Sequence, residues 1–240
     1  MGSVELTTLP AEVQLPSGNS QFADVDWFKQ ALNSNERLEN FHMDAFFSTM
    51  AINYDIQLDN VGVREWTIID RVGLNALRET DLGICSSVLV PYSRGYYPRC
   101  SGLRWVDCNR VFGFAWIEGC HWILYELSLK DEVIRVYFAE EVSWMEVKCF
   151  FDNVRSNLKK FIQWDNNSDI RDPSTEREWE VVRSTCFVGG PDGIQSGVMA
   201  LKFLECLIYN LPLAIVDPAC CASYRYSFCA QLFANCIRKV

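Results

Sequence analysis

The alternation of apolar and polar residues along the chain predicts most of its secondary structure. The densest apolar region spans residues 110–138, where three apolar and aromatic runs are separated by short polar breaks. We expect strands at 110–117, 120–129 and 133–138, with 130–132 as the hairpin turn between the last two. Apolar residues occupy both faces of these runs, which is typical of central strands covered by helices.

Apolar residues spaced three or four positions apart predict helices on both sides of this region. One helix is expected to begin with Asn40 as its N-cap, and the last is expected to bury Tyr226, Cys229, Phe233 and Ile237. The expected helices cover residues 22–32, 40–50, 147–161, 198–208 and 222–238, with a helical turn at 74–77. Further strands are expected at 61–63, 66–69, 86–91 and 179–182.

Residues 92–99 combine tyrosines and arginines and are expected to form an exposed loop. Such a stretch is more often a solvated loop than a binding surface, although Tyr and Arg are the residues that protein interfaces favour. His42 lies near the start of an expected helix, where a surface or capping role is more common than catalysis.

A glycine-rich loop at residues 189–197 leads directly into the helix expected from Val198 onward. Main-chain amides that converge on a helix N-terminus stabilise negative charge and can activate a nucleophile. The side chain at this point is Ser196. Serine is also a preferred N-cap residue, and from composition alone this simpler interpretation is favoured.

The composition indicates one folded domain without affinity for anionic surfaces. The chain has 240 residues, 49% of them hydrophobic, and a formal net charge of −9. We expect a flexible arm at 1–20 and a folded domain at 21–240. The acidity argues against a nucleic-acid partner and against anionic membranes, because contacts to phosphate need clustered Lys and Arg. No run of 18 apolar residues occurs, so no membrane-spanning helix is expected.

The cysteines are numerous but do not predict a metal site. Eleven cysteines and only two histidines are present, and no two cysteines are spaced as Cys-x-x-Cys. Zinc ligation needs such spacings, so we expect no metal and no cofactor. The odd cysteine count and the absence of a signal peptide indicate free, mostly buried thiols in a reducing compartment, either nucleus or cytoplasm.

Two segments carry a resemblance to a known family. Residues 194–205 read Ile-Gln-Ser-Gly-Val-Met-Ala-Leu-Lys-Phe-Leu-Glu, and residues 121–137 hold His121-Trp122, a turn and Val136-Tyr137. Over residues 25–238 the chain resembles the ubiquitin-like-protein-specific (SUMO) proteases, which are papain-like cysteine peptidases, and most closely their plant, transposon-associated branch. The resemblance implies an α+β papain-like fold, with a central, mostly antiparallel sheet flanked by helices and the Ser196 helix packed through the middle.

The resemblance also assigns positions to the catalytic residues of the family. His121 matches the catalytic histidine, and Ser196 occupies the position of the nucleophilic cysteine. Phe138 occupies the position of the aspartate that orients the histidine, and Gly190 that of the glutamine that forms the oxyanion hole. Gln195 stands where the family has an aspartate before its cysteine.

Two further positions concern binding. Trp122 matches one wall of the tunnel that holds the Gly-Gly tail of the modifier in this family. Arg37 replaces the tryptophan of the other wall. Arg37, Trp122 and Gln195 are therefore the candidate binding residues.

These replacements lead to a hypothesis with two alternatives. We expect a catalytically inactive SUMO-protease-like protein that binds a protein partner: a ubiquitin-like modifier, a modified protein or a new partner. The first alternative is a protease, fully or weakly active, that uses His121 with Ser196. A laboratory Cys-to-Ser exchange could account for Ser196, but not for Phe138, Gly190 or Arg37. The second alternative is a domesticated transposon fragment with no role beyond folding. The oligomeric state is not predicted.

Overall fold

A computed structural model describes residues 13–15, 22–58, 64–79, 82–97, 102–117, 121–139, 142–164, 179–187 and 193–237. Five strands form one mixed sheet in chain order: β3 (Trp66–Ile68), β4 (Arg110–Ile117), β5 (His121–Ser128), β6 (Val133–Ala139) and β7 (Glu180–Phe187). The three central strands are antiparallel, whereas β3 and β7 each pair in parallel with their neighbours. The α+β class and the predicted strands of residues 110–138 are confirmed. The strand predicted at 61–63 lies outside the described residues.

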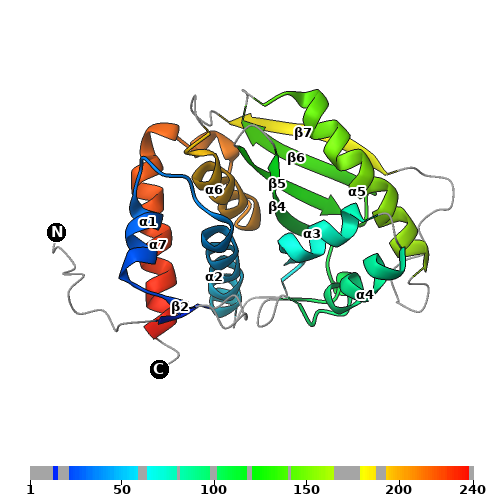
Figure 1. The fold of residues 1–240 in the computed structure, drawn as a ribbon, viewed down its shortest axis with the longest axis horizontal. Coiled ribbons are helices and arrows are strands. Elements are labelled where there is room, and N and C mark those ends of the chain that lie inside the picture. Colours follow the sequence, from blue (N-terminus) through cyan, green and yellow to red (C-terminus); the bar gives the residue numbers. More distant parts are fainter. Residues whose placement is uncertain are drawn as a thin grey trace.

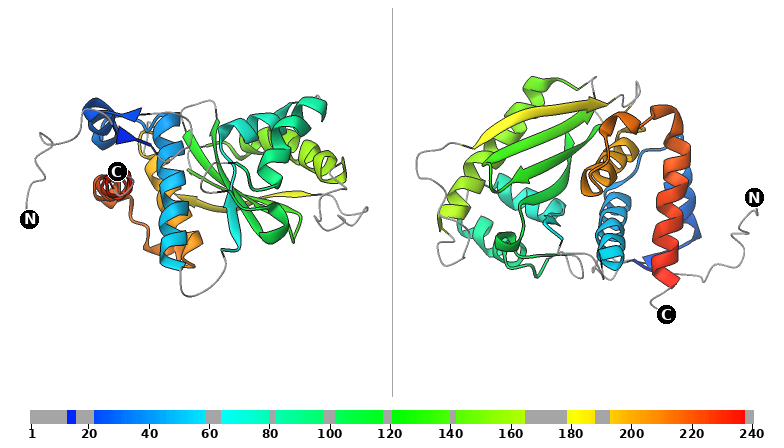
Figure 2. Two further views of the ribbon diagram at one scale, coloured as in Figure 1. Left: turned by 90° about the horizontal axis from the view of Figure 1, so that it is seen from below. Right: turned by 180° about the vertical axis from the view of Figure 1, so that it is seen from behind.

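Helices cover both faces of the sheet (Figures 1 and 2). On one side lie α1 (Val25–Leu32), α2 (Asn40–Leu58), α6 (Ser196–Ile208) and α7 (Cys221–Ile237), and on the other α3 (Arg71–Arg78), α4 (Leu82–Ser93) and α5 (Trp144–Trp164). The helix that begins at Ser196 packs against β5 and β6 and against α2 and α7. It therefore runs through the middle of the molecule, as the family resemblance implies.

The side chains of β5 show why a continuous apolar run is needed in the centre of the sheet. Every residue of this strand is buried except His121, which is half-buried. Tyr125 packs against Phe151 of α5, with ring centres 5.2 Å apart. Trp122, on the opposite face, lies against the start of α6. The strand is thus enclosed by a helix on each side, as apolar residues on both faces predict.

The flexible arm predicted at 1–20 falls mainly outside the described residues. Within it, β1 (Val13–Gln14) pairs antiparallel with β2 (Phe22–Ala23), and Leu15 is buried in the core. Residues 13–15 are therefore part of the fold, because they pair with β2 and bury Leu15. The polar residues around this leucine in the sequence did not indicate that it would be buried.

The strand predicted at 86–91 is wrong, because these residues belong to α4, with Pro91 inside the helix. A short apolar run is compatible with either a strand or a buried helix, and packing against α3 and α5 selects the helix here. Tyr92, expected in an exposed loop, is buried in α4 and donates its hydroxyl hydrogen to Asp70. Tyr96, three residues beyond the end of α4, is exposed as expected.

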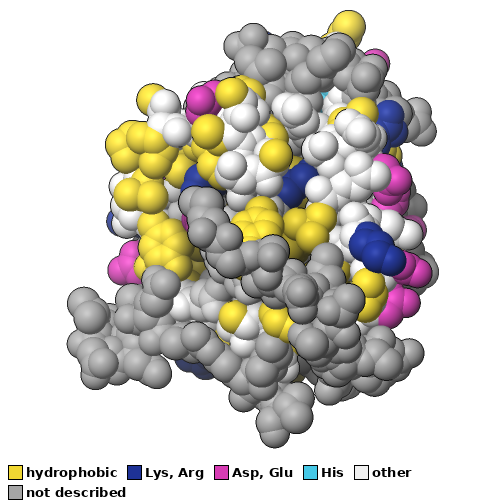
Figure 3. All heavy atoms as spheres, turned by 90° about the vertical axis from the view of Figure 1, so that its left-hand side faces the viewer, with side chains coloured by type: hydrophobic (Ala, Val, Ile, Leu, Met, Phe, Trp, Pro, Cys, Tyr) yellow, Lys and Arg dark blue, Asp and Glu magenta, His cyan; other side chains and the backbone are white. Residues whose placement is uncertain are grey.

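The buried face of α7 also differs from the prediction. Cys229 is buried, but Tyr226 is 58% exposed and Phe233 is half-buried, while the side chain of Ile237 lies outside the described residues. Arg225 is buried, whereas the adjacent Tyr226 is exposed. The apolar pattern of the sequence cannot predict a buried arginine. Figure 3 shows apolar side chains gathered on the side of the molecule that includes α7. The exposed large apolar residues in this part of the chain are Leu211, Ile215 and Tyr226.

Candidate functional site

The start of α6 holds Ser196 in a closed environment. Gly193 has φ +63°, a left-handed conformation that favours glycine, and turns the chain into the helix. The main-chain N–H of Ser196 donates to the carbonyl oxygen of Gly193 at 3.1 Å, and its hydroxyl donates to the same oxygen at 2.6 Å. Ser196 is the first helical residue and is 0% exposed, whereas Gln195 holds the N-cap position. The interpretation of Ser196 as an ordinary N-cap is therefore wrong.

The hydroxyl of Ser196 contacts the strand that carries the candidate histidine. The main-chain N–H of Trp122 donates to Ser196 Oγ at 2.9 Å. Since this amide belongs to the peptide bond that links His121 to Trp122, the structure brings Ser196 next to the His121 main chain across 74 positions of sequence. The two segments that the sequence singled out thus meet.

Trp122 links α6 to the segment before α2. Its indole N–H donates to the carbonyl oxygen of Leu38 at 2.7 Å, and its side chain is buried. A Cβ atom on Gly197 would lie 2.9 Å from Trp122 Cδ1, closer than such atoms approach in proteins. Glycine at position 197 is therefore required by the close approach of α6 to this ring.

Trp116, which the sequence alone did not indicate, lies between Arg37 and Trp122. The ring of Trp116 lies 5.2 Å from that of Trp122, and the guanidinium carbon of Arg37 lies 5.9 Å from the centre of the Trp116 ring. Trp116 is 39% exposed, so part of its ring surface is open to a partner. Its position in β4, directly opposite Trp122 in β5, is the feature that could have identified it from the sequence. We call Arg37, Trp116 and Trp122 the aromatic cluster.

Phe138 fills its place with an apolar ring. It is 0% exposed and stacks on Trp144, with ring centres 5.8 Å apart and planes 10° from parallel, while the Arg183 guanidinium lies 5.1 Å from its ring centre. Because Leu124 pairs with Tyr137, the next residues Ile123 and Phe138 lie together, and His121 shares their face of the sheet. Phe138 is thus on the same face as the histidine, but its side chain has no atom that accepts a hydrogen bond.

Gly190 and Gln195 are the two remaining candidate positions. Gly190 lies outside the described residues. Gln195 is half-buried, and its carbonyl oxygen accepts from the N–H of Met199 at 3.0 Å, which leaves its main chain engaged in the first turn of α6.

The second histidine of the chain is structural. His42 Nδ1 accepts from the N–H of Glu39 at 3.0 Å, a capping contact at the start of α2. The side chain is buried rather than on the surface, and burial lowers the pKa of His42 to about 4. Two residues along the helix, burial raises the pKa of Asp44 to about 6. The two pKa shifts have opposite directions but the same cause, because burial disfavours the charged form of each side chain.

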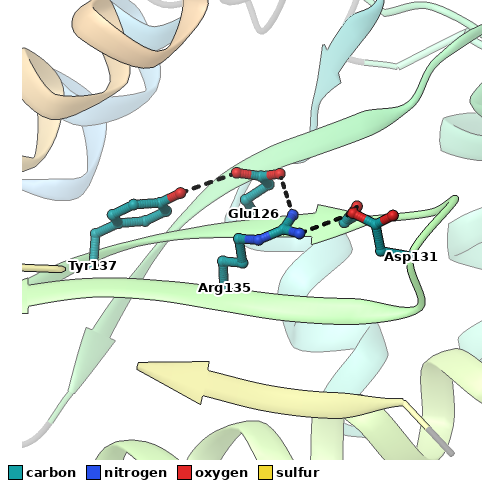
Figure 4. Close-up of polar contacts among 5 residues, drawn as sticks. Glu126, Asp131, Arg135 and Tyr137 are labelled. Carbon is teal, nitrogen blue, oxygen red and sulfur yellow. Dashed lines mark hydrogen bonds and ion pairs between the residues drawn. The ribbon is translucent and has the colours of Figure 1, made fainter. Parts of the chain in front are cut away.

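A polar cluster on β5 and β6, also missed from the sequence, clamps the hairpin (Figure 4). Buried Glu126 accepts from Arg135 Nη1 at 2.9 Å and from the Tyr137 hydroxyl at 3.1 Å, and Arg135 Nη2 donates to Asp131 at 2.8 Å. The hydrogen bond from Arg135 lowers the pKa of the Asp131 carboxyl, and burial raises the pKa of Tyr137. Because the charges are paired across neighbouring strands, the cluster stabilises the register of the hairpin.

The described residues form neither a metal site nor a membrane-spanning helix. No group of three or more His, Cys, Asp or Glu side chains there is arranged to hold a metal ion. No helix in the same residues combines the length and apolarity needed to cross a bilayer. The cysteines described in full are free thiols, and five of these seven are buried.

Comparison with known proteins identifies the fold. No family model and no curated protein matches the sequence. The structure is similar to the C-terminal Ulp1 protease domain in complex with Smt3, the yeast ortholog of SUMO, with a TM-score of 0.66 and 14% identity over 96% of this chain and 91% of that domain. It is also similar to the Ulp1-like SUMO protease catalytic domain of Chaetomium thermophilum, with a TM-score of 0.66 and 16% identity over 95% of this chain and 85% of that one. A form of Ulp1 with its catalytic cysteine oxidized to a sulfonic acid gives a TM-score of 0.64 and 14% identity, over 96% of this chain and 91% of that one. The chain therefore has the fold of the SUMO proteases.

Proposed function

We propose that this chain is a catalytically inactive relative of the SUMO proteases, of the plant, transposon-associated branch, that acts by binding a protein. The observation that carries the proposal is the state of Ser196. Its hydroxyl is fully buried, accepts a hydrogen bond from Trp122 and donates one to Gly193. A nucleophile must reach the carbonyl carbon of its substrate at about 3–3.5 Å, and in this structure the Ser196 hydroxyl is buried and engaged by two main-chain groups instead.

The surroundings of His121 support the same proposal. A serine nucleophile needs a histidine base whose tautomer is set by a third group, and loss of that group costs about 10⁴ in rate in serine proteases. Phe138 lies on the face of the sheet that His121 shares, stacked on Trp144. A phenyl ring cannot orient an imidazole by accepting its N–H.

We further propose that the partner is a ubiquitin-like modifier bound over the aromatic cluster. The yeast domain of the same fold is in complex with its SUMO ortholog. In this chain Trp116 offers an exposed aromatic surface beside Arg37, and Trp and Arg are the residue types that most often dominate binding energy. A modified protein or a new partner at the same surface is the alternative occupant.

Isothermal titration calorimetry tests the binding proposal with purified SUMO-type and ubiquitin-type modifiers. We expect binding to one of them that weakens at least about tenfold in Trp116→Ala, the loss expected for a central aromatic contact. Tyr226→Ala is the matched control, because it removes another exposed aromatic side chain, from α7. If no modifier produces heat, the modifier proposal fails and only a different partner remains.

A fluorogenic substrate that ends in a modifier tail tests whether the chain is an enzyme. The protease alternative has one observation in its favour, the contact between Ser196 and the peptide that follows His121. We expect no turnover above that of Ser196→Ala. Turnover that this substitution abolishes would overturn the proposal. Activity regained by Ser196→Cys together with Phe138→Asp and Gly190→Gln would show that only the chemistry has been lost.

A further inference from the structure

Arg225 is a buried cation whose hydrogen bonds, within the described residues, all go to main-chain carbonyls. It lies on α7 and is 2% exposed. Its guanidinium donates to the carbonyl oxygens of Ala31 at 2.9 Å, Ile194 at 3.3 Å and Glu36. Burying a charge is costly unless hydrogen bonds compensate it, so these three acceptors account for its position in the structure.

Two of these acceptors belong to segments that border the candidate site. Glu36 directly precedes Arg37, and Ile194 is part of the turn that leads into Ser196. Arg225 therefore connects the last helix to the segment that carries Arg37 and to the segment that carries Ser196, which are more than 150 positions apart in the sequence.

Trp122 joins the same two segments from the side of the sheet. Its indole N–H binds Leu38 at 2.7 Å, and its main-chain N–H binds Ser196 at 2.9 Å. The hydrogen bonds thus form a closed circuit that runs from Arg225 to segment 36–38, to Trp122, to segment 194–196, and back to Arg225. We call this circuit the site frame.

We propose that Arg225 is a positioning residue that sets the spacing between the two segments beside the candidate site. On the side of the sheet the two segments are joined by the hydrogen bonds of Trp122 and by the packing of Leu38 beside Gly197. Arg225 adds a second link on the side of α7, which restricts pivoting about the first because a guanidinium offers several N–H donors in a rigid planar fork. The effect on partner binding rests on the proposed function, whereas the effect on the site frame does not.

Amide hydrogen exchange measures the site frame without any partner. In Arg225→Gln we expect the amides of Trp122 and Met199 to exchange about tenfold faster than in the wild type, the factor that corresponds to loss of one hydrogen bond to a charged group. Asn157→Ala is the matched control. Asn157 is also buried and donates to two main-chain carbonyls, of Leu77 at 3.0 Å and Glu79 at 2.7 Å, on the other side of the sheet. Its loss should not change exchange at Trp122.

Unchanged protection of Trp122 in Arg225→Gln overturns the proposal, and so does an equal loss of protection in Asn157→Ala, because the effect would then be global. If Arg225→Gln does not fold, Arg225→Lys replaces it, since lysine keeps the charge but lacks the planar fork. In calorimetry, binding of the SUMO-type or ubiquitin-type modifier should weaken about tenfold in the Arg225 variant and not in Asn157→Ala. Unaltered affinity overturns the binding half of the proposal. A wild-type protein that binds no modifier refutes the proposed function and leaves the exchange result to decide the role of Arg225.

Discussion

Replacement of Ser196 by alanine should destabilise the fold rather than abolish an activity. The change removes the hydroxyl that accepts the Trp122 N–H at 2.9 Å and donates to Gly193 at 2.6 Å. Because Ser196 is 0% exposed, the substitution leaves the Trp122 N–H buried without its acceptor. An unsatisfied buried donor costs about 1–3 kcal/mol, and we expect the free energy of unfolding to fall by about 2 kcal/mol.

Urea denaturation followed by circular dichroism measures this loss. The midpoint should fall while the m-value stays unchanged, because the surface exposed on unfolding is the same. Ser227→Ala is the control, since it removes an exposed hydroxyl from α7. A Ser196→Ala protein within about 0.5 kcal/mol of the wild type would refute the structural role, because surface substitutions typically fall within that range.

Three further predictions concern burial at and near the site. The pKa of His42 is about 4 in the folded protein and 6.5 in the unfolded chain, so its contribution to stability falls as the pH drops from 6.5 to 4. The pKa of Asp44 is about 6 in the folded protein and 3.8 in the unfolded chain, so its contribution to stability rises as the pH drops from 6 toward 4. The two contributions largely cancel in the wild type between pH 4 and 6. In Asp44→Asn only the His42 contribution remains, so the free energy of unfolding should fall by about 1.4 kcal/mol for each pH unit that the pH is lowered from 6 to 4. A urea midpoint that does not change with pH in this variant would contradict this. Gly197→Ala should cost about 1–3 kcal/mol by displacing Trp122, and a variant as stable as the wild type in urea would show that the ring can move freely. Phe138→Asp should lower the thermal midpoint far more than Phe138→Leu, because it puts a charged carboxyl in place of a fully buried ring that stacks on Trp144, and equal midpoints would disprove that.

The sheet and the central helix could be predicted because each is encoded by a local pattern. The apolar runs of residues 110–138 and the helical spacing after Val198 are both confirmed. The segment around Val88–Val90 was predicted as a strand because a short apolar run before Pro91 satisfies both periodicities. Its packing against the neighbouring α3 and against α5, which is distant in the sequence, selects the helix over the strand.

The proximity of the two candidate segments was predictable, but their contacts were not. The family resemblance implied that Ser196 lies near the strand of His121, and in the structure the two segments are in contact. Which atoms meet could not be predicted, because the partners of a buried polar group come from elsewhere in the chain. Arg225 illustrates this, since in the sequence it is a charged residue of an amphipathic helix and in the structure it is enclosed by main-chain carbonyls.

The placement of the helices has a consequence for the order in which this protein can mature on the ribosome. The layer on the α6 side of the sheet combines helices from residues 25–58 and 196–237, whereas the strands and the opposite layer come from the residues between them. A nascent chain therefore emerges with its sheet and α3–α5 available while one broad apolar face still awaits α6 and α7. Such a chain depends on contacts of high sequence separation, which form late and leave apolar surface open to aggregation meanwhile. Chaperone dependence should therefore be concentrated in the interval after the sheet has left the ribosome and before α6 and α7 have emerged.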